Sequence, residues 1–296
     1  MFKKVKPFFL IIALLLSQTC MTVNVIFDLG GVLIGANKYT IMRNVGFYSF
    51  FMYLVKLNNP FALRTRLFTI MDLMPAINKN SYGAADENGK PLPNITCDWL
   101  MGTKTTKELR TQVVEFIESN PQAFYNSSEK NLIKKLLDIM FTPEIFANGT
   151  TLLAKGLKFA KKCKKAGHKL FVLSNWDRES ALLVIKKYPK LFKLFDKRNI
   201  IISGEIGMIK PDPSIYEYML TDSNLDPKEC IFFDDQEINV NSAQNCGIHA
   251  VLCQDITYKK MVNELNTFVA NIEKKEIISE NIIPGDKESE ATTIPA

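Results

Sequence analysis

Four short apolar runs, each followed by polar residues, constrain the fold of this chain more than any other feature. They cover residues 23–27, 169–173, 199–203 and 230–233, and stretches with helical spacing separate them. Strands joined through helices form parallel sheets with right-handed crossovers, so all four runs are expected to end at the same edge of one sheet. The sequence therefore predicts an α/β fold in which helices flank a parallel sheet.

The first run ends at Asp28, and two glycines, Gly30 and Gly31, follow closely. Open α/β sheets bind ligands at the carboxyl ends of their strands, and glycines there let backbone N–H groups approach an anion. A carboxylate at this place suits nucleophilic attack on a bound phosphate, although taken alone it fits an ordinary turn equally well. The other strand ends favour phosphate chemistry because they add further polar groups, which are Ser174, Asn175, Lys210, Asp234 and Asp235.

At these residues the chain resembles the haloacid dehalogenase-like (HAD) hydrolase superfamily, whose motifs match the strand ends. The matching segments are Phe27–Val32, Leu173–Asn175, Lys210–Asp212 and Phe233–Asp235. The resemblance covers residues 23–34 and 149–253. It implies a Rossmann-like parallel sheet of about five strands, a Mg²⁺ ion and an aspartyl-phosphate intermediate, and most members of the superfamily are phosphatases.

The resemblance also implies a metal site. Asp28, the backbone carbonyl of Gly30 and Asp235 are its expected ligands, with Asp234 as close support. Hard oxygen ligands of this kind suit Mg²⁺, which retains several waters. Asp28 is in addition the expected nucleophile, and a neighbouring cation favours its ionised form.

A phosphate site is implied beside the metal. Gly30, Ser174, Asn175 and Lys210 are expected to bind the phosphate of the substrate. The Ser174 hydroxyl would donate to a phosphate oxygen, and Lys210 would act as a catalytic group by offsetting the charge that develops during transfer.

One position departs from the pattern of many HAD phosphatases. They place a second aspartate two residues after the nucleophile as general acid and base, and here that residue is Gly30. Such help is typically worth about 10²–10⁴ in rate. Three readings follow: another group or water serves, the leaving group departs without a proton, or the chain only binds a phosphorylated ligand. We favour the first, because the other catalytic positions are filled.

The function predicted is therefore a Mg²⁺-dependent phosphomonoesterase that acts on a small phosphorylated metabolite, in the manner of the sugar-phosphate phosphatases that share the D-x-G pattern. A 2-haloacid dehalogenase is one alternative, since halide departs without a proton, but it has no use for the Asp234–Asp235 pair. A catalytically weak phosphate-binding protein is the other.

The domain plan follows from the long gap between the first two motifs. Residues 23–35 and 149–273 are expected to form the catalytic core, and residues 36–148 an inserted, mainly helical cap that selects substrate. Helical spacing of apolar residues at 106–117 and 129–140 supports the cap. Residues 274–296 have no apolar period and are expected to be a disordered tail.

Composition excludes several other chemistries. The chain has two histidines, His168 and His249, and both fit structural positions, so a histidine nucleophile or a His-ligated zinc is not expected. The six cysteines show no C-x-x-C spacing. The net charge of +6 comes largely from lysines of residues 155–169 that alternate with apolar residues, as on the solvated face of a helix, and we expect no nucleic-acid partner.

The N-terminus carries a separate signal. Lysines at positions 3, 4 and 6 precede an uncharged apolar stretch at 8–16, which is the order found in a secretory signal peptide. We therefore read residues 1–22 as a leader or membrane anchor and expect export, with membrane contact only if this segment stays uncleaved. The competing reading is that Met21 is the true start and the protein is cytoplasmic.

Overall fold

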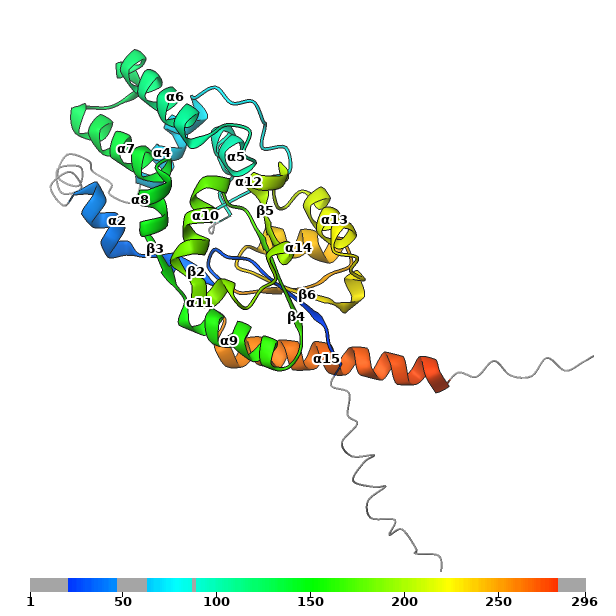
Figure 1. Ribbon diagram of the computed structural model, residues 1–296. Coiled ribbons are helices and arrows are strands. Elements are labelled where there is room, and N and C mark those ends of the chain that lie inside the picture. Colours follow the sequence, from blue (N-terminus) through cyan, green and yellow to red (C-terminus); the bar gives the residue numbers. More distant parts are fainter. Residues whose placement is uncertain (1–20, 47–62, 87–88, 282–296) are drawn as a thin grey trace, which may run out of the picture.

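The core of the molecule is a five-stranded parallel sheet, seen in a computed structural model that describes residues 21–46, 63–86 and 89–281 (Figure 1). The strand order is β5-β4-β1-β6-β7. In that order the strands are Ile200–Ile202, Lys169–Ser174, Asn24–Phe27, Cys230–Asp234 and His249–Leu252. The predicted α/β, Rossmann-like fold class is confirmed.

Helices cover both faces of this sheet because its central strands are buried on both sides. Phe27 and its alternate neighbours pack with α9 (Ala154–Lys165), α10 (Arg178–Lys187) and α15 (Tyr258–Asn281). Ile26 lies on the other face, where α13 (Pro213–Asp222) and α14 (Glu237–Asn245) pack. Side chains alternate along a strand, so an uninterrupted apolar run such as β1 serves both layers.

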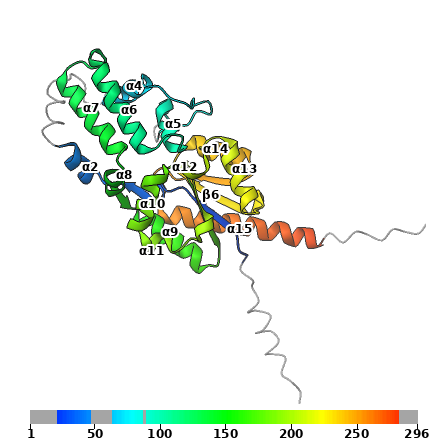
Figure 2. The ribbon, with the colours of Figure 1, turned by 45° about the horizontal axis from the view of Figure 1, so that its top comes forward.

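The segment inserted between β2 (Ile34–Ala36) and β3 (Thr150–Leu152) is helical in its described parts, and we call residues 36–148 the cap (Figure 2). Its helices are α2 (Lys38–Val45), α4 (Leu63–Asp72), α5 (Asn94–Leu100), α6 (Thr106–Ser119), α7 (Ser127–Met140) and α8 (Pro143–Asn148). The helices predicted at 106–117 and 129–140 are confirmed as α6 and α7. Trp99, Leu109 and Phe141 belong to a separate apolar core inside the cap.

The cap joins the sheet domain through a small antiparallel pair. Strand β2 pairs with β3, so the chain leaves and re-enters the core at one place. This pair could not be predicted from the sequence, because two three-residue strands carry too little periodicity to be recognised. Helix α8 packs on α10, and its Ala147 is buried in the core rather than in the cap.

Short elements complete the fold. They are the helices α11 (Pro189–Phe192) and α12 (Ser203–Ile206) and the 3₁₀ turns Pro121–Ala123, Lys197–Asn199 and Pro227–Glu229. Helix α15 continues to Asn281. The prediction of a disordered tail from residue 274 is therefore wrong over residues 274–281. Its first half is anchored by Leu265 and Phe268, and extending an existing helix costs little where no Gly or Pro intervenes.

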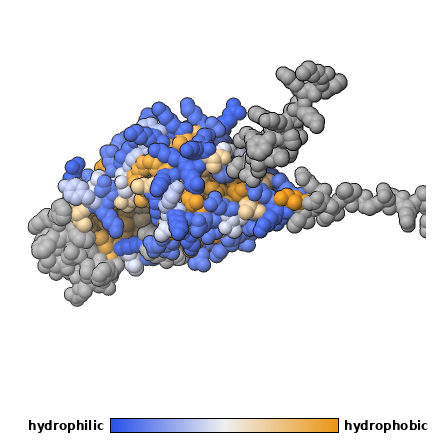
Figure 3. Space-filling model, turned by 90° about the horizontal axis from the view of Figure 1, so that it is seen from below, coloured by the Kyte–Doolittle hydropathy of each residue, from blue (hydrophilic) through white to orange (hydrophobic). Residues whose placement is uncertain are grey.

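The remaining terminal predictions fall outside the described residues. The structure does not describe residues 1–20 and 282–296, so the leader and the rest of the tail stay predictions. Within the described part of the chain, no helix combines the length and the apolar character that crossing a bilayer requires. Viewed from below, the surface shows a hollow with hydrophobic walls at the end of the molecule that carries α2 and α7 (Figure 3).

Candidate active site

Three strand ends and one loop bring the predicted site residues together. Lys210, in the loop between α12 and α13, places its Nζ atom 2.9 Å from Oδ1 of Asp28 and 2.6 Å from Oδ2 of Asp234. The Lys210 side chain is 1% exposed, so these ion pairs are shielded from solvent. We call Asp28, Ser174, Lys210, Asp234 and Asp235 the strand-end cluster.

The last residue of β4 and the residue after it have different roles. Ser174 is buried, and its hydroxyl favours the ionised form of Asp28 by lowering the pKa of that carboxyl. Asn175 holds the backbone of Lys210 through two bonds of 2.8 Å, one donated by its Nδ2 to the carbonyl and one accepted by its Oδ1 from the N–H. Asn175, predicted to bind phosphate, thus also orients the lysine.

The adjacent carboxylates Asp234 and Asp235 have different surroundings. Asp234 is fully buried, and its Oδ1 accepts from the backbone N–H of Gln236 at 2.8 Å and from Asn239 Nδ2 at 3.1 Å. With Oδ2 paired to Lys210, both of its oxygens are engaged. Asp235 instead lines a cavity and packs against Gly31. Gly31 has a φ of +65°, and a Cβ at this position would collide with the Asp235 carboxylate.

Burial and crowding of charge shift the ionisation of these groups. Burial raises the pKa of Asp28 to about 6, with Lys210 opposing the shift and Asp234 adding to it. Burial, followed by the negative charges of Asp28 and Asp234, raises the pKa of Asp235 to about 7. Burial disfavours the charged form of Lys210, but Asp234 and Asp28 outweigh it and raise the pKa of the ammonium group. Three carboxyl groups therefore share one ammonium, and a divalent cation would favour their ionised forms.

The oxygen atoms around Asp28 fit such a cation. Asp28 and Asp235 both line the cavity beside Gly30, whose carbonyl is the predicted third ligand. Asn239 lines the same cavity, and its Oδ1 is a buried acceptor without a hydrogen-bond partner. In the described part of the chain no three His, Cys, Asp or Glu side chains suffice to enclose a metal by themselves. A cation held here would need carbonyl and water oxygens as well, which is how proteins hold Mg²⁺.

A sequence model of the family described as haloacid dehalogenase-like hydrolase matches residues 88–253, more than half of the chain. The chain belongs to this family. Ser174, Lys210, Asp234 and Asp235 of the strand-end cluster lie within the matched residues, and the predicted resemblance is confirmed.

Curated proteins match this hydrolase over shorter stretches. Bifunctional epoxide hydrolase 2 of Rattus norvegicus is 32% identical over 102 residues, which is 33% of this chain and 18% of the relative. Drimenol cyclase drtB of Aspergillus calidoustus is 28% identical over 131 residues, 43% of this chain and 24% of the relative. In both cases the matched part is about a quarter or less of the relative's own length.

A solved structure shares the fold along most of the molecule. A HAD family enzyme of Bacteroides thetaiotaomicron, an aspartate-to-alanine mutant in complex with magnesium and inorganic phosphate, has a TM-score of 0.50 at 22% identity. The alignment covers 78% of this chain and 93% of that one. At this identity the likeness supports the fold alone.

The strand-end cluster borders a cavity of about 610 Å³. Its floor holds Asp28, Lys210 and Asp235, and Trp99 and Trp176 are among the residues around it. The side towards the cap, which we call the cap wall, consists of Ile41, Leu67, Leu100, Leu136, Ile139 and Met140. No cap residue could be assigned to the site from sequence, because residues that line a cavity and residues that fill a core have the same apolar spacing.

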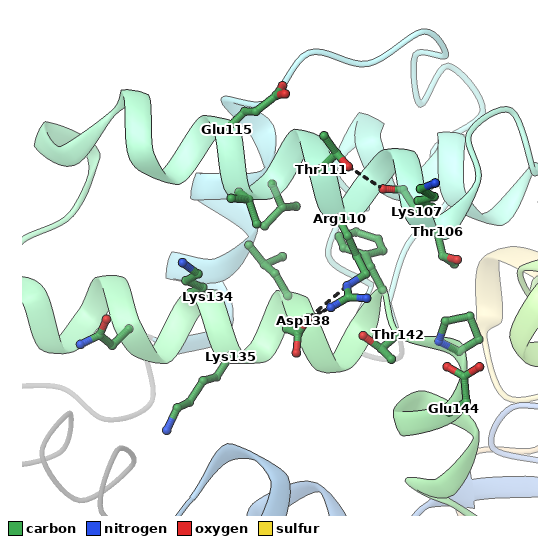
Figure 4. A pocket seen from close by; sticks show the side chains of 16 residues that line it. Thr106, Lys107, Arg110, Thr111, Glu115, Lys134, Lys135, Asp138, Thr142 and Glu144 are labelled. Atoms are coloured by element: carbon green, nitrogen blue, oxygen red, sulfur yellow. Dashed lines mark hydrogen bonds and ion pairs between the residues drawn. The ribbon is translucent and has the colours of Figure 1, made fainter.

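A larger cavity of about 1000 Å³ lies between α6 and α7, on the cap alone (Figure 4). Charged side chains line much of it, and Arg110 pairs there with Asp138 at 2.7 Å. No member of the strand-end cluster lines it, whereas Asp28, Lys210 and Asp235 all line the smaller cavity.

Proposed function

We propose that this hydrolase is a Mg²⁺-dependent phosphatase that cleaves phosphate monoesters through an aspartyl-phosphate on Asp28. The observation that carries the proposal is the buried pairing of Lys210 with both Asp28 and Asp234. It fixes one ammonium group beside the nucleophile at the floor of a cavity, where charge on a transferring phosphoryl group needs to be neutralised.

The proposed reaction has two steps. A carboxylate oxygen of Asp28 attacks phosphorus, and the bond from phosphorus to the leaving oxygen breaks. A water molecule then attacks phosphorus, the bond to Asp28 breaks, and inorganic phosphate leaves. Lys210 holds Asp28 in place during both steps, and the Ser174 hydroxyl favours the ionised form of that carboxyl by lowering its pKa. Mg²⁺ held by Asp28, Asp235 and the Gly30 carbonyl would neutralise charge on the phosphate oxygens.

The proton for the leaving oxygen has no obvious side-chain donor. Among the described residues that line the cavity, the titratable ones are Asp28, Lys210 and Asp235, and all three have other tasks. We therefore assign this proton to a water molecule that enters with the substrate, and the hydroxide that it leaves supplies the oxygen that attacks phosphorus in the second step. A side chain introduced at position 30 would have room to donate this proton. A Cβ on Gly30 would lie 3.4 Å from Asp28 Oδ2, and the backbone there is not left-handed.

Carbon–halogen hydrolysis is the second candidate, and the glycine at position 30 favours it. The position of Asp235 argues against it, since a second carboxylate held against Gly31 has a use only when a cation is bound.

One assay separates these functions. The protein is offered p-nitrophenyl phosphate and 2-chloropropionate, each with and without Mg²⁺. We expect phosphate release that requires the metal. Halide release without metal would establish the second function instead, and inactivity towards a broad set of phosphate esters would leave a phosphate-binding protein.

A further inference from the structure

We infer that the substrate is a phosphate monoester whose leaving group is a hydrocarbon-like alcohol, such as an alkyl or isoprenyl chain, rather than a sugar. This inference rests on the proposed phosphatase function and adds the class of leaving group. It differs from the sugar-phosphate preference that the D-x-G pattern suggests.

The cap wall supplies the first argument. Its members come from four different helices of the cap, α2, α4, α5 and α7, and all are aliphatic or thioether side chains that remain partly exposed. Phe146 of α8 and Trp176 of the core extend the same apolar surface towards Asp28. A leaving group that projects from a phosphate on Asp28 would therefore meet mainly hydrocarbon on the cap side, where the indole N–H of Trp99 is a buried donor without a partner.

Charged side chains supply the second argument, because several of those in the described part of the cap form ion pairs away from this cavity. Arg66 pairs with Glu129 at 2.7 Å, and Lys104 with Asp98 at 3.3 Å. In the described parts of the cap, no charged side chain lines the cavity that contains Asp28. A leaving group with a carboxylate or a second phosphate would find no counter-charge there.

Asn175 and Thr150, two polar residues that line the core side of the cavity, are already engaged in hydrogen bonds within the protein, whereas Asn239 Oδ1 lies beside the proposed metal site. Both ends of the Asn175 amide bind the backbone of Lys210, and the Thr150 hydroxyl donates to the carbonyl of Ala147 at 2.7 Å. Sugar hydroxyls that lose water against such a wall leave hydrogen bonds unmade, whereas methylene groups gain by leaving water. The wall thus selects for hydrocarbon.

The direct test is a chain-length series. Phosphate release from ethyl, butyl and hexyl phosphate is measured with Mg²⁺, together with glucose 6-phosphate. The alcohols differ little as leaving groups, so the trend reports burial of the chain. We expect kcat/KM to rise about fourfold per methylene, or on the order of 10²-fold from ethyl to hexyl, with glucose 6-phosphate well below hexyl phosphate.

A pair of matched variants tests whether the cap wall causes the trend. Ile139→Asn places an amide in the wall and should lower kcat/KM for hexyl phosphate about tenfold more than for ethyl phosphate. Val114→Asn makes a similar change on α6, where Val114 is 45% exposed and lines the larger cavity between α6 and α7. It should leave the series unchanged.

The outcomes separate the inference from the function on which it rests. A flat series in the native protein, or a preference for glucose 6-phosphate, overturns the inference while the phosphatase function stands. Release of phosphate from none of these esters or from p-nitrophenyl phosphate overturns both.

Discussion

The two sides of the active-site cavity differ in almost every physical respect. The strand-end cluster is charged, buried and tied together by ion pairs, with Lys210 bound to two carboxylates within 3 Å. The cap wall is apolar, partly exposed and has no hydrogen bonds of its own through its side chains. The first side limits the reaction to chemistry that a carboxylate and a cation can perform. Under the proposed function, the second side would contact the part of the substrate that does not react, so reaction and specificity would reside on different parts of the molecule.

The largest effect should come from the nucleophile. Asp28→Asn is nearly isosteric, and Lys210 keeps Asp234 as a partner, so the fold should survive. We expect phosphate release to fall on the order of 10⁴-fold or more, by the same factor for ethyl and hexyl phosphate. Steady-state assays check this, with circular dichroism as the control for folding. Turnover close to that of the native protein would remove Asp28 from the mechanism.

Lys210→Met should be the next largest change. It leaves Asp28 and Asp234 buried without a counter-charge, so we expect a loss of roughly 3–5 kcal/mol in the free energy of unfolding near neutral pH. The rate constant kcat should fall about 10²–10³-fold, as when one electrostatic donor is removed. Urea unfolding and Mg²⁺-dependent assays measure the two effects. If the loss of activity depended on chain length, the division between the two sides would be wrong.

A glycine pair tests the placement of Asp235. Gly31→Ala pushes a methyl group into the Asp235 carboxylate, so the Mg²⁺ concentration for half-maximal activity should rise about 10–100-fold. Gly207→Ala is the matched control, since Gly207 has a φ of +74° and a Cβ there meets nothing within 4 Å. Equal Mg²⁺ dependence in the two variants would show that Asp235 does not hold the metal.

The smallest effect is a linkage between pH and Mg²⁺. Burial raises the pKa of Asp28 to about 6 and that of Asp235 to about 7, from ordinary values of 3.8. Both groups bind protons more tightly in the folded chain, so between pH 3.8 and about 7 they make the metal-free protein less stable as pH rises.

Mg²⁺ binds the ionised carboxylates, so its stabilising effect should change in the opposite direction. At a concentration 100 times its Kd it adds about 2.7 kcal/mol, and the increase in Tm should be larger at pH 8 than at pH 5.5. Thermal unfolding with and without Mg²⁺ at both values measures this, and Asp235→Asn should abolish most of it. An increase in Tm that is equal at both pH values would contradict the assignment of the ligands.

The strand-end cluster could be predicted from sequence because its residues obey local rules. Apolar runs end where strands end, and parallel topology then brings Asp28, Ser174 and Asp235 to one edge. The separate tasks of Asp234 and Asp235 could not be derived in the same way, since they depend on which side of the strand end each carboxylate faces. The family resemblance distinguishes Asp235 as the expected ligand, and the packing of Gly31 and Lys210 against the two carboxylates gives the physical reason.

The cap wall illustrates the opposite case. Leu136 and Leu137 are neighbours on α7 with the same chemistry, yet Leu136 lines the cavity and Leu137 is fully buried in the cap core. Helical periodicity identifies the apolar face of α7, but the split of that face between core and cavity depends on how the cap sits above the sheet. Sequence spacing carries no information on that arrangement.

The most direct test of the account is to trap the phosphoryl group on the enzyme. The protein is mixed with a phosphate monoester that carries a radiolabelled phosphoryl group and Mg²⁺, quenched with acid during turnover, and digested for peptide mapping. We predict label on the peptide that contains Asp28, and none in the Asp28→Asn variant. Turnover without labelled protein, or label on a different residue, would contradict the proposal that the strand-end cluster works through Asp28.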